Sequence, residues 1–171
     1  MALGQRVMGM SKVGLIFILL FWLCPIHSIA GEDPKVWSLR GISGFQVIVE
    51  KPTSDARAAG ITEEAIRNQV VAHFQTFLPQ LSLDKKEGPS LYVRTILYKR
   101  KKEDLYYGTI SVHIDRAVIV LSPEGNFPAF SQVWENTVVF SGKDPLLGTY
   151  EILGKLLRLL IEDFKEANPS Q

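Results

Sequence analysis

The sequence predicts an α+β fold, a two-layer sandwich in which a mostly antiparallel sheet carries two amphipathic helices on one face. Residues 63–78 and 144–165 have apolar side chains at a period of 3.6, which is typical of helices lying on a surface. Between them, three segments alternate apolar and polar residues as half-buried strands do. Short turns join these three strands, which favours an antiparallel meander. With one earlier strand, the expected order is β-α-β-β-β-α.

Residues 1–30 have the pattern of a cleaved signal peptide. Arg6 and Lys12 form a basic start, residues 13–26 are almost uninterruptedly apolar, and Ser28-Ile29-Ala30 offers small residues to a signal peptidase. We expect cleavage after Ala30 and a periplasmic or secreted product. A retained anchor is the alternative, but the apolar run is shorter than the roughly 20 residues of a membrane-spanning helix.

Cys24 is the only cysteine of the chain and lies inside this segment. Lipid anchoring at Cys24 is not expected, because a bacterial lipoprotein has a small residue directly before its cysteine and Leu23 is not small. After cleavage the exported chain would have no thiol, and therefore no disulfide and no cysteine metal ligand.

The exported part, 31–171, is nearly neutral. It keeps 17 of the 19 basic residues against 18 acidic ones, which argues against a nucleic-acid partner. The whole chain is 46% apolar and 22% charged, as globular domains are. We expect an N-terminal arm over 31–41 that lies along the sheet and has Trp37 as its one large apolar residue, a single α+β domain over 42–167, and a short tail over 168–171.

The first half of the domain has one strand and one helix. The strand is expected over Phe45–Glu50, and a loop over Thr53–Gly60 follows it. Thr62 is the predicted N-cap of the helix, which Pro79 ends. The expected buried stripe of this helix consists of Ile66, Val70, Phe74, Phe77 and Leu78.

The next strands form a predicted hairpin over 91–98 and 105–121, followed by a turn over 122–126 and a strand over Phe130–Phe140. After Asp115-Arg116 the apolar residues of the long strand lie at odd-numbered and at even-numbered positions, which point to opposite faces of the sheet. Either a bulge lies there, or the second half of the strand is buried on both faces.

The closing helix begins with Asp144 as N-cap and Pro145 at its first position, and Asn168-Pro169 ends it. Its expected buried stripe recurs at steps of three and four residues and consists of Leu146, Tyr150, Leu153, Leu157, Leu160 and Phe164.

The sequence offers little catalytic or metal-binding chemistry. Only His73 and His113 remain after cleavage, and neither has a metal-site spacing. His73 flanks the buried stripe of its helix, where a local hydrogen bond is the usual role. The row Thr109, Ser111, His113 and Asp115 resembles a nucleophile, base and carboxylate, but same-face neighbours of a strand lie roughly 6.5–7 Å apart, too far for a direct relay. We expect no catalytic residue, no metal and no cofactor.

Two surface features could bind a partner. The basic run Lys99–Lys102 could contact lipid phosphates, although Glu103 and Asp104 dilute it and a solvated hairpin tip is the simpler interpretation. By parity, the residues Tyr92, Arg94, Ile96 and Tyr98 face away from the helices and form a candidate interaction face. Cross-strand pairs that only stabilise a solvated sheet are the alternative.

The element order, the helix start Gly60-Ile61-Thr62-Glu63-Glu64 and the leucine-rich closing helix resemble the small bacterial envelope domains typified by the lipopolysaccharide-assembly protein LptE and the N-terminal domain of TolB. The resemblance implies a non-enzymatic periplasmic module that binds an envelope protein, lipid or lipopolysaccharide component. The predicted function is therefore binding through an open sheet face or strand edge. A carrier of a small hydrophobic ligand or lipid, with a pocket between helices and sheet, is the alternative.

Overall fold

The computed structural model describes residues 33–169, so the predicted signal peptide over 1–30 lies outside the described residues. The described chain forms four helices and four strands, in the order α2 (Pro34–Trp37), β1 (Gln46–Val49), α3 (Ser54–Ala58), α4 (Glu63–Phe77), β2 (Ser90–Arg100), β3 (Leu105–Ser122), β4 (Gly125–Gly142) and α5 (Pro145–Ala167).

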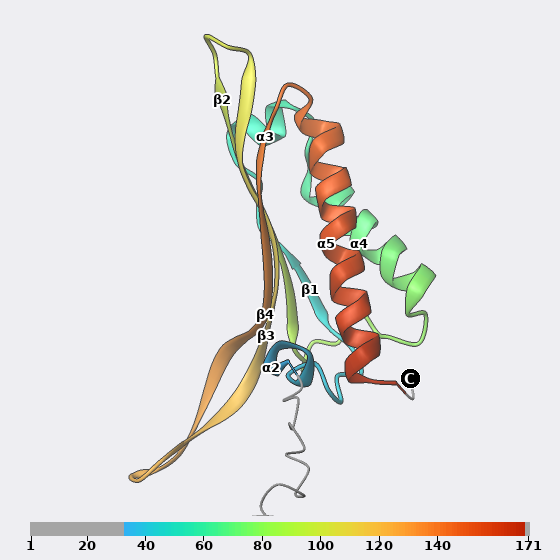
Figure 1. Ribbon diagram of the computed structural model, residues 1–171, viewed down its shortest axis with the longest axis vertical. Coiled ribbons are helices and arrows are strands. Elements are labelled where there is room, and N and C mark those ends of the chain that lie inside the picture. The colour runs from blue at the N-terminus through green and yellow to red at the C-terminus, as the bar shows by residue number, and fades with distance from the viewer. Residues whose placement is uncertain (1–32, 170–171) are drawn as a thin grey trace, which may run out of the picture. The chain divides into compact units, whose positions relative to one another are not determined.

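The four strands form one sheet in the order β1-β2-β3-β4 (Figure 1). β1 runs parallel to β2, with Val47 opposite Leu91, and the helices α3 and α4 make the crossover between them. β2, β3 and β4 pair antiparallel in sequence order, which confirms the predicted meander. The α+β fold class is thus confirmed, with a mixed sheet in which only the first pair is parallel.

The loop predicted over Thr53–Gly60 is wrong, because Ser54–Ala58 forms the short helix α3. β1 ends at Val49, so the outer edge of β2 continues without a strand beside it. The Thr53 hydroxyl donates to the Leu97 carbonyl at 2.5 Å and accepts from the Leu97 amide at 3.1 Å. The Asp55 carboxylate accepts from the Lys99 amide at 2.9 Å. Side chains at the start of α3 therefore replace the missing strand along β2.

A β-bulge interrupts the pairing of β3 with β4. Ile114 pairs with Trp134 while Asp115 pairs with Gln132, so Val133 is the extra residue. Of the two alternatives for the parity change after Asp115-Arg116, the bulge is correct. Burial of the second half on both faces is wrong, since Ile119 and Leu121 are 67% and 76% exposed.

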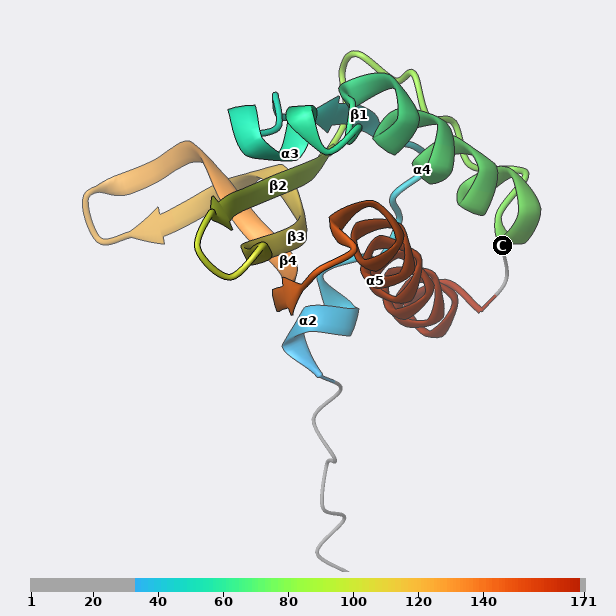
Figure 2. The same ribbon diagram turned by 90° about the horizontal axis from the view of Figure 1, so that it is seen from above.

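The helices α4 and α5 lie on one side of the sheet (Figures 1 and 2). The predicted caps are present: Thr62 accepts from the Ala65 amide at 3.1 Å, and Asp144 accepts from the Leu147 amide at 3.0 Å. Asn168 ends α5 as predicted. Three members of the predicted stripes are not fully buried. Phe77 and Leu146 are exposed, because they lie at the last and first turns of their helices, beyond the sheet-facing surface. Tyr150 is partly buried against the core.

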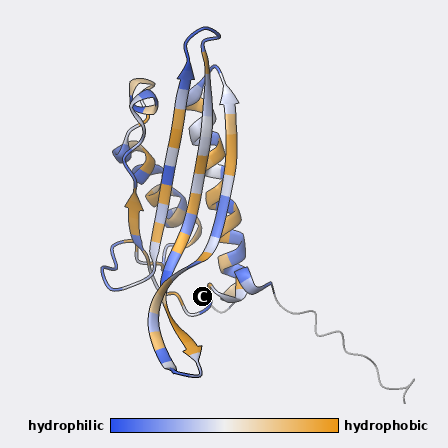
Figure 3. Cartoon of the chain, turned by 90° about the vertical axis from the view of Figure 1, so that its left-hand side faces the viewer, coloured by the Kyte–Doolittle hydropathy of each residue, from blue (hydrophilic) through white to orange (hydrophobic). Residues whose placement is uncertain are grey.

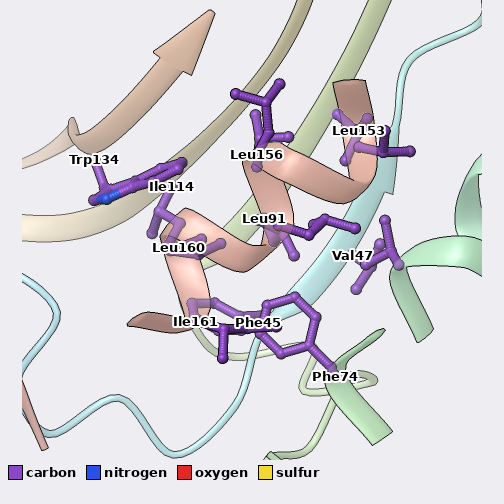
Figure 4. Close-up of a cluster of buried hydrophobic side chains, with 14 of the residues drawn as sticks. Phe45, Val47, Phe74, Leu91, Ile114, Trp134, Leu153, Leu156, Leu160 and Ile161 are labelled. Carbon is purple, nitrogen blue, oxygen red and sulfur yellow. The ribbon is translucent and has the colours of Figure 1, made fainter. Parts of the chain in front are cut away.

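The hydrophobic core lies between these helices and the sheet (Figure 4). Phe45 packs edge-on against Phe74 of α4 and Phe164 of α5, with ring centroids 5.8 and 6.1 Å apart. Trp134 of β4 is buried, and its indole N–H donates to the Asp163 carboxylate of α5 at 2.7 Å. Apolar burial of this kind supplies most of the driving force for the fold.

The predicted arm over 31–41 contains α2, and its buried side chains are Val36 and Leu39 rather than Trp37, which is 61% exposed. The Trp37 side chain therefore takes no part in the core. The arm packs beside α5 and the bulged part of β4 (Figure 2), where the Ser38 hydroxyl donates to the Val133 carbonyl at 2.8 Å. Among the helices of the described residues, none combines the length and apolarity needed to cross a membrane.

Candidate interaction surface

One face of the sheet has no helix over it (Figure 3). We call this surface the open face and define it by the alternate residues of β2 and their partners across β3: Tyr92 and His113, Arg94 and Ser111, Ile96 and Thr109, and Tyr98 and Tyr107. The predicted interaction face thus lies on the side of the sheet that was expected from the alternation of β2, and it consists of Tyr92, Arg94, Ile96 and Tyr98. Val139 of β4, paired with Thr109, lies on the same face and is 77% exposed.

Aromatic pairs occupy both ends of the open face. The rings of Tyr92 and His113 stack at a centroid distance of 4.9 Å and an angle of 9°. Near the other end, Tyr98 and Tyr107 lie 6.0 Å apart and are 49% and 46% exposed. The Arg100 guanidinium lies 5.9 Å from the Tyr107 ring. Cross-strand pairs of this kind stabilise the sheet, and they also hold large side chains in fixed positions at its surface.

Arg94 sits between the aromatic pairs and forms an ion pair with Glu50, at 2.7 Å from Nε to Oε2. The hydrogen bond and charge of Glu50 raise the pKa of Arg94, so the guanidinium stays charged throughout the ordinary pH range. Both side chains remain partly exposed, at 49% and 36%, and an exposed ion pair of this type contributes little to stability. Its effect is to fix the direction of the Arg94 side chain.

The row Thr109, Ser111, His113 and Asp115 lies on the open face but does not form a relay. The distance from His113 Nε2 to Asp115 Oδ2 is 3.9 Å, longer than a hydrogen bond. Ser111 is buried, and the hydrogen bonds of the described residues include none between Ser111 and His113. The His113 ring instead stacks on Tyr92.

His73 has the local role expected from its place beside the buried stripe of α4. Its Nδ1 lies 3.0 Å from the Gln69 carbonyl one turn earlier. Across the described residues, no group of three or more histidine, cysteine, aspartate or glutamate side chains is arranged to hold a metal ion.

The basic run Lys99–Lys102 lies at the β2–β3 turn, as the hairpin interpretation requires. Asp104 pairs with Lys99 at 2.7 Å, and Glu103 pairs with Arg100 at 3.2 Å. The Lys99 ammonium lowers the pKa of Asp104, and Asp104 in turn raises the pKa of Lys99. Because two of the bases are paired, this turn does not present four unopposed positive charges.

The most exposed apolar surface is a feature that sequence reasoning missed. β3 and β4 continue beyond the other strands as a two-stranded ribbon, which we call the projecting hairpin and define as residues 116–131 (Figures 1 and 3). Its strongly exposed apolar residues are Ile119, Val120, Leu121, Phe127 and Phe130, the last at 85%. The available signal was a pair of uncharged apolar runs on either side of a turn whose only charge is Glu124.

A cleft of about 690 Å³ lies where the projecting hairpin leaves the open face. Ile48 and Tyr92 line it from the sheet, and Arg116 and Phe130 line it from the hairpin. The open face and the hairpin therefore form one continuous, partly apolar surface.

Comparison of the chain with protein-family models, with curated proteins and with solved structures finds no match. The resemblance to small envelope domains therefore stays a prediction from element order.

Proposed function

We propose that this chain is an exported, non-enzymatic binding module of the cell envelope that docks a protein or another envelope component on its open face. The observation that carries the proposal is the uncovered sheet surface with Tyr98 and Tyr107 about half exposed on it. Tyrosine and arginine, with tryptophan, are enriched at the energetic centres of protein interfaces.

The strand backbone supports this proposal because it holds the exposed side chains in place before a partner arrives. Tyr98, Ile96 and Arg94 project from consecutive same-face positions of β2, and each has a partner across β3. Side chains already ordered in the free protein lose less conformational entropy on binding, which favours affinity.

The ligand-carrier alternative has less support. Leu153, Leu157 and Phe164 of α5 fill the space between helices and sheet and are completely buried. The main clefts of the described chain lie at its surface, and none of these three side chains lines them. A carrier would need a pocket of about 300 Å³ or more in that layer.

The test is capture of the partner with and without a charge on the open face. The full chain is cross-linked in intact cells of the source organism, purified, and its co-purifying proteins and lipids are quantified by mass spectrometry. Ile96→Asp is expected to abolish capture of a specific partner, because it buries a carboxylate in the contact.

Leu159→Asp is the matched control, because Leu159 is a half-exposed apolar residue on α5, away from the sheet. It should capture the partner as the wild type does, and circular dichroism should show both variants folded. Equal capture by wild type and Ile96→Asp, or unfolding by Ile96→Asp, would rule out docking on the open face. Amino-terminal sequencing of the protein from the periplasmic fraction checks export, with Gly31 as the expected first residue.

A further inference from the structure

The projecting hairpin has two strand edges, and they differ. On one side, β2 begins at Ser90, which pairs with Asp115, so the residues of β3 from Arg116 to Ser122 pair only with β4. No strand of the described chain lies along this edge of β3. Alternate residues of an unpaired strand direct their N–H and C=O groups outward, and such an edge readily accepts another strand.

The opposite edge, that of β4, is less suited to strand addition. Pro128 lies in the middle of this segment, opposite Ile119. Proline has no N–H to donate, and it is one of the residues by which natural proteins prevent pairing at sheet edges. The ribbon therefore has one open edge and one blocked edge.

The β3 edge carries none of the usual protections. The run Ala117-Val118-Ile119-Val120-Leu121 is uncharged, free of proline and rich in β-branched residues, which favour strands. Its side chains are exposed on both faces of the ribbon, with Ile119 and Leu121 on one and Val120 on the other. An edge of this composition is expected to have a partner.

We propose that two copies of this chain associate by antiparallel pairing of their β3 edges over residues 117–121, giving a continuous sheet in the order β4-β3-β3-β4. The partner is a second copy because a twofold axis perpendicular to the sheet pairs this run with itself and keeps each side chain on its own face. With the axis at Ile119, Ile119 lies opposite its own copy, and Val118 lies opposite Val120 of the other copy. Apolar side chains then meet apolar side chains on both faces.

The charges of the hairpin are compatible with this pairing. Glu124 is the only charged residue between Arg116 and Glu135, and it lies in the turn beyond the paired run. No like charges therefore meet across the twofold axis.

A lipid surface is less suited to the same hairpin. Hydrocarbon cannot satisfy the outward N–H and C=O groups of the two edges, and Glu124 at the tip would enter the membrane first. A second β3 strand satisfies the backbone groups and leaves Glu124 in water. The inference is independent of the open-face proposal, because it concerns the backbone edge of β3 over residues 117–121 and not the side chains of the open face.

The first test is the oligomeric state of the full chain, expressed with residues 1–30 so that any processing occurs, measured by analytical ultracentrifugation over a range of concentrations. We expect a dimer for the wild type. Ile119→Lys places two like charges opposite each other and should weaken association at least about tenfold. Phe130→Lys is the matched control, because Phe130 is on β4 of the same hairpin and more exposed, and it should remain dimeric.

The second test fixes the strand register by disulfide cross-linking in a Cys24→Ser background, which removes the chain's only other thiol. Under mild oxidation, a single cysteine at Ile119 should cross-link more strongly than one at Val118 or Val120, because only residue 119 lies opposite its own copy, with the two Cα atoms within about 4.4–6.8 Å. A cysteine at Phe130 should not cross-link, because two β3 strands separate the two β4 strands.

A monomeric wild type, an equal effect of Ile119→Lys and Phe130→Lys, or uniform cross-linking that includes Phe130 would overturn the proposal. Sedimentation of a monomer with vesicles of phosphatidylcholine and phosphatidylglycerol, lost in both lysine variants, would also overturn it and assign the hairpin to the membrane surface. Dimerisation that only Ile119→Lys weakens, with one preferred cross-link, supports it.

Discussion

Thr149 of α5 carries a hydroxyl in the hydrophobic core without a hydrogen-bond partner. The residue is completely buried, and its Oγ1 has no donor or acceptor within reach among the described residues. Burying an unpaired hydroxyl costs free energy, and valine has the same shape without it. Thr149→Val is therefore expected to raise the free energy of unfolding by about 1 kcal/mol. Chemical denaturation followed by circular dichroism measures the change.

Thr76→Val is the control for the effect of removing a threonine hydroxyl from a helix. Thr76 is also helical, but it is exposed and its hydroxyl donates to the Ala72 carbonyl at 2.7 Å. Removing a satisfied, exposed hydroxyl should leave stability within about 0.5 kcal/mol. A loss of stability in Thr149→Val would mean that its hydroxyl has a partner in solution, and the prediction would be wrong.

At the scale of single elements, α3 holds the edge of β2 through side chains. Thr53→Val removes both hydrogen bonds to Leu97 while keeping the shape of the residue. We expect the free energy of unfolding to fall by about 1–3 kcal/mol, because two part-buried backbone groups lose their partner. Amide hydrogen exchange should accelerate at Leu97 and stay slow at Lys99, whose amide is held by Asp55.

Asp55→Ala is the reciprocal variant and should produce the opposite pattern, with faster exchange at Lys99 and unchanged exchange at Leu97. If both amides accelerate equally in either variant, α3 and the end of β2 open as one unit. The separate roles of Thr53 and Asp55 would then be refuted.

The elements that sequence reasoning predicted well are those whose signal is local. Thr62 and Asp144 mark helix starts because capping depends on residues three positions away, and the parity of Tyr92, Arg94, Ile96 and Tyr98 follows directly from strand geometry. Helix α3 was missed because its side chains bond to β2, a partner 44 positions away in sequence. Such a contact leaves no periodic pattern.

At the scale of the whole molecule, exposure depends on where an element ends relative to its neighbours. For the apolar residues of 117–121, burial on both faces was one of the two predictions, and it would hold if β2 and the helices extended that far. They do not, because β2 begins opposite Asp115, and so the same residues form the projecting hairpin. Strand composition alone cannot distinguish a strand buried within a sheet from one that projects beyond it.

The same geometry predicts that the hairpin is dispensable for the fold. In the described chain, no buried core residue lies between Ile114 and Trp134. Replacing residues 117–130 by an Asn-Gly turn, which suits a two-residue hairpin between Arg116 and Ser131, should leave the circular dichroism spectrum native-like and the free energy of unfolding within about 1 kcal/mol. Thermal and chemical unfolding measure this.

Trp134→Ala is the contrasting variant just outside the hairpin. It removes a buried ring and its hydrogen bond to Asp163, and it should lower the free energy of unfolding by about 3–5 kcal/mol. Loss of cooperative unfolding on shortening the hairpin would show that the hairpin belongs to the core. A native-like, monomeric shortened chain would instead assign residues 117–130 to association, since a segment that does not stabilise its own fold has no structural need for so much exposed apolar surface.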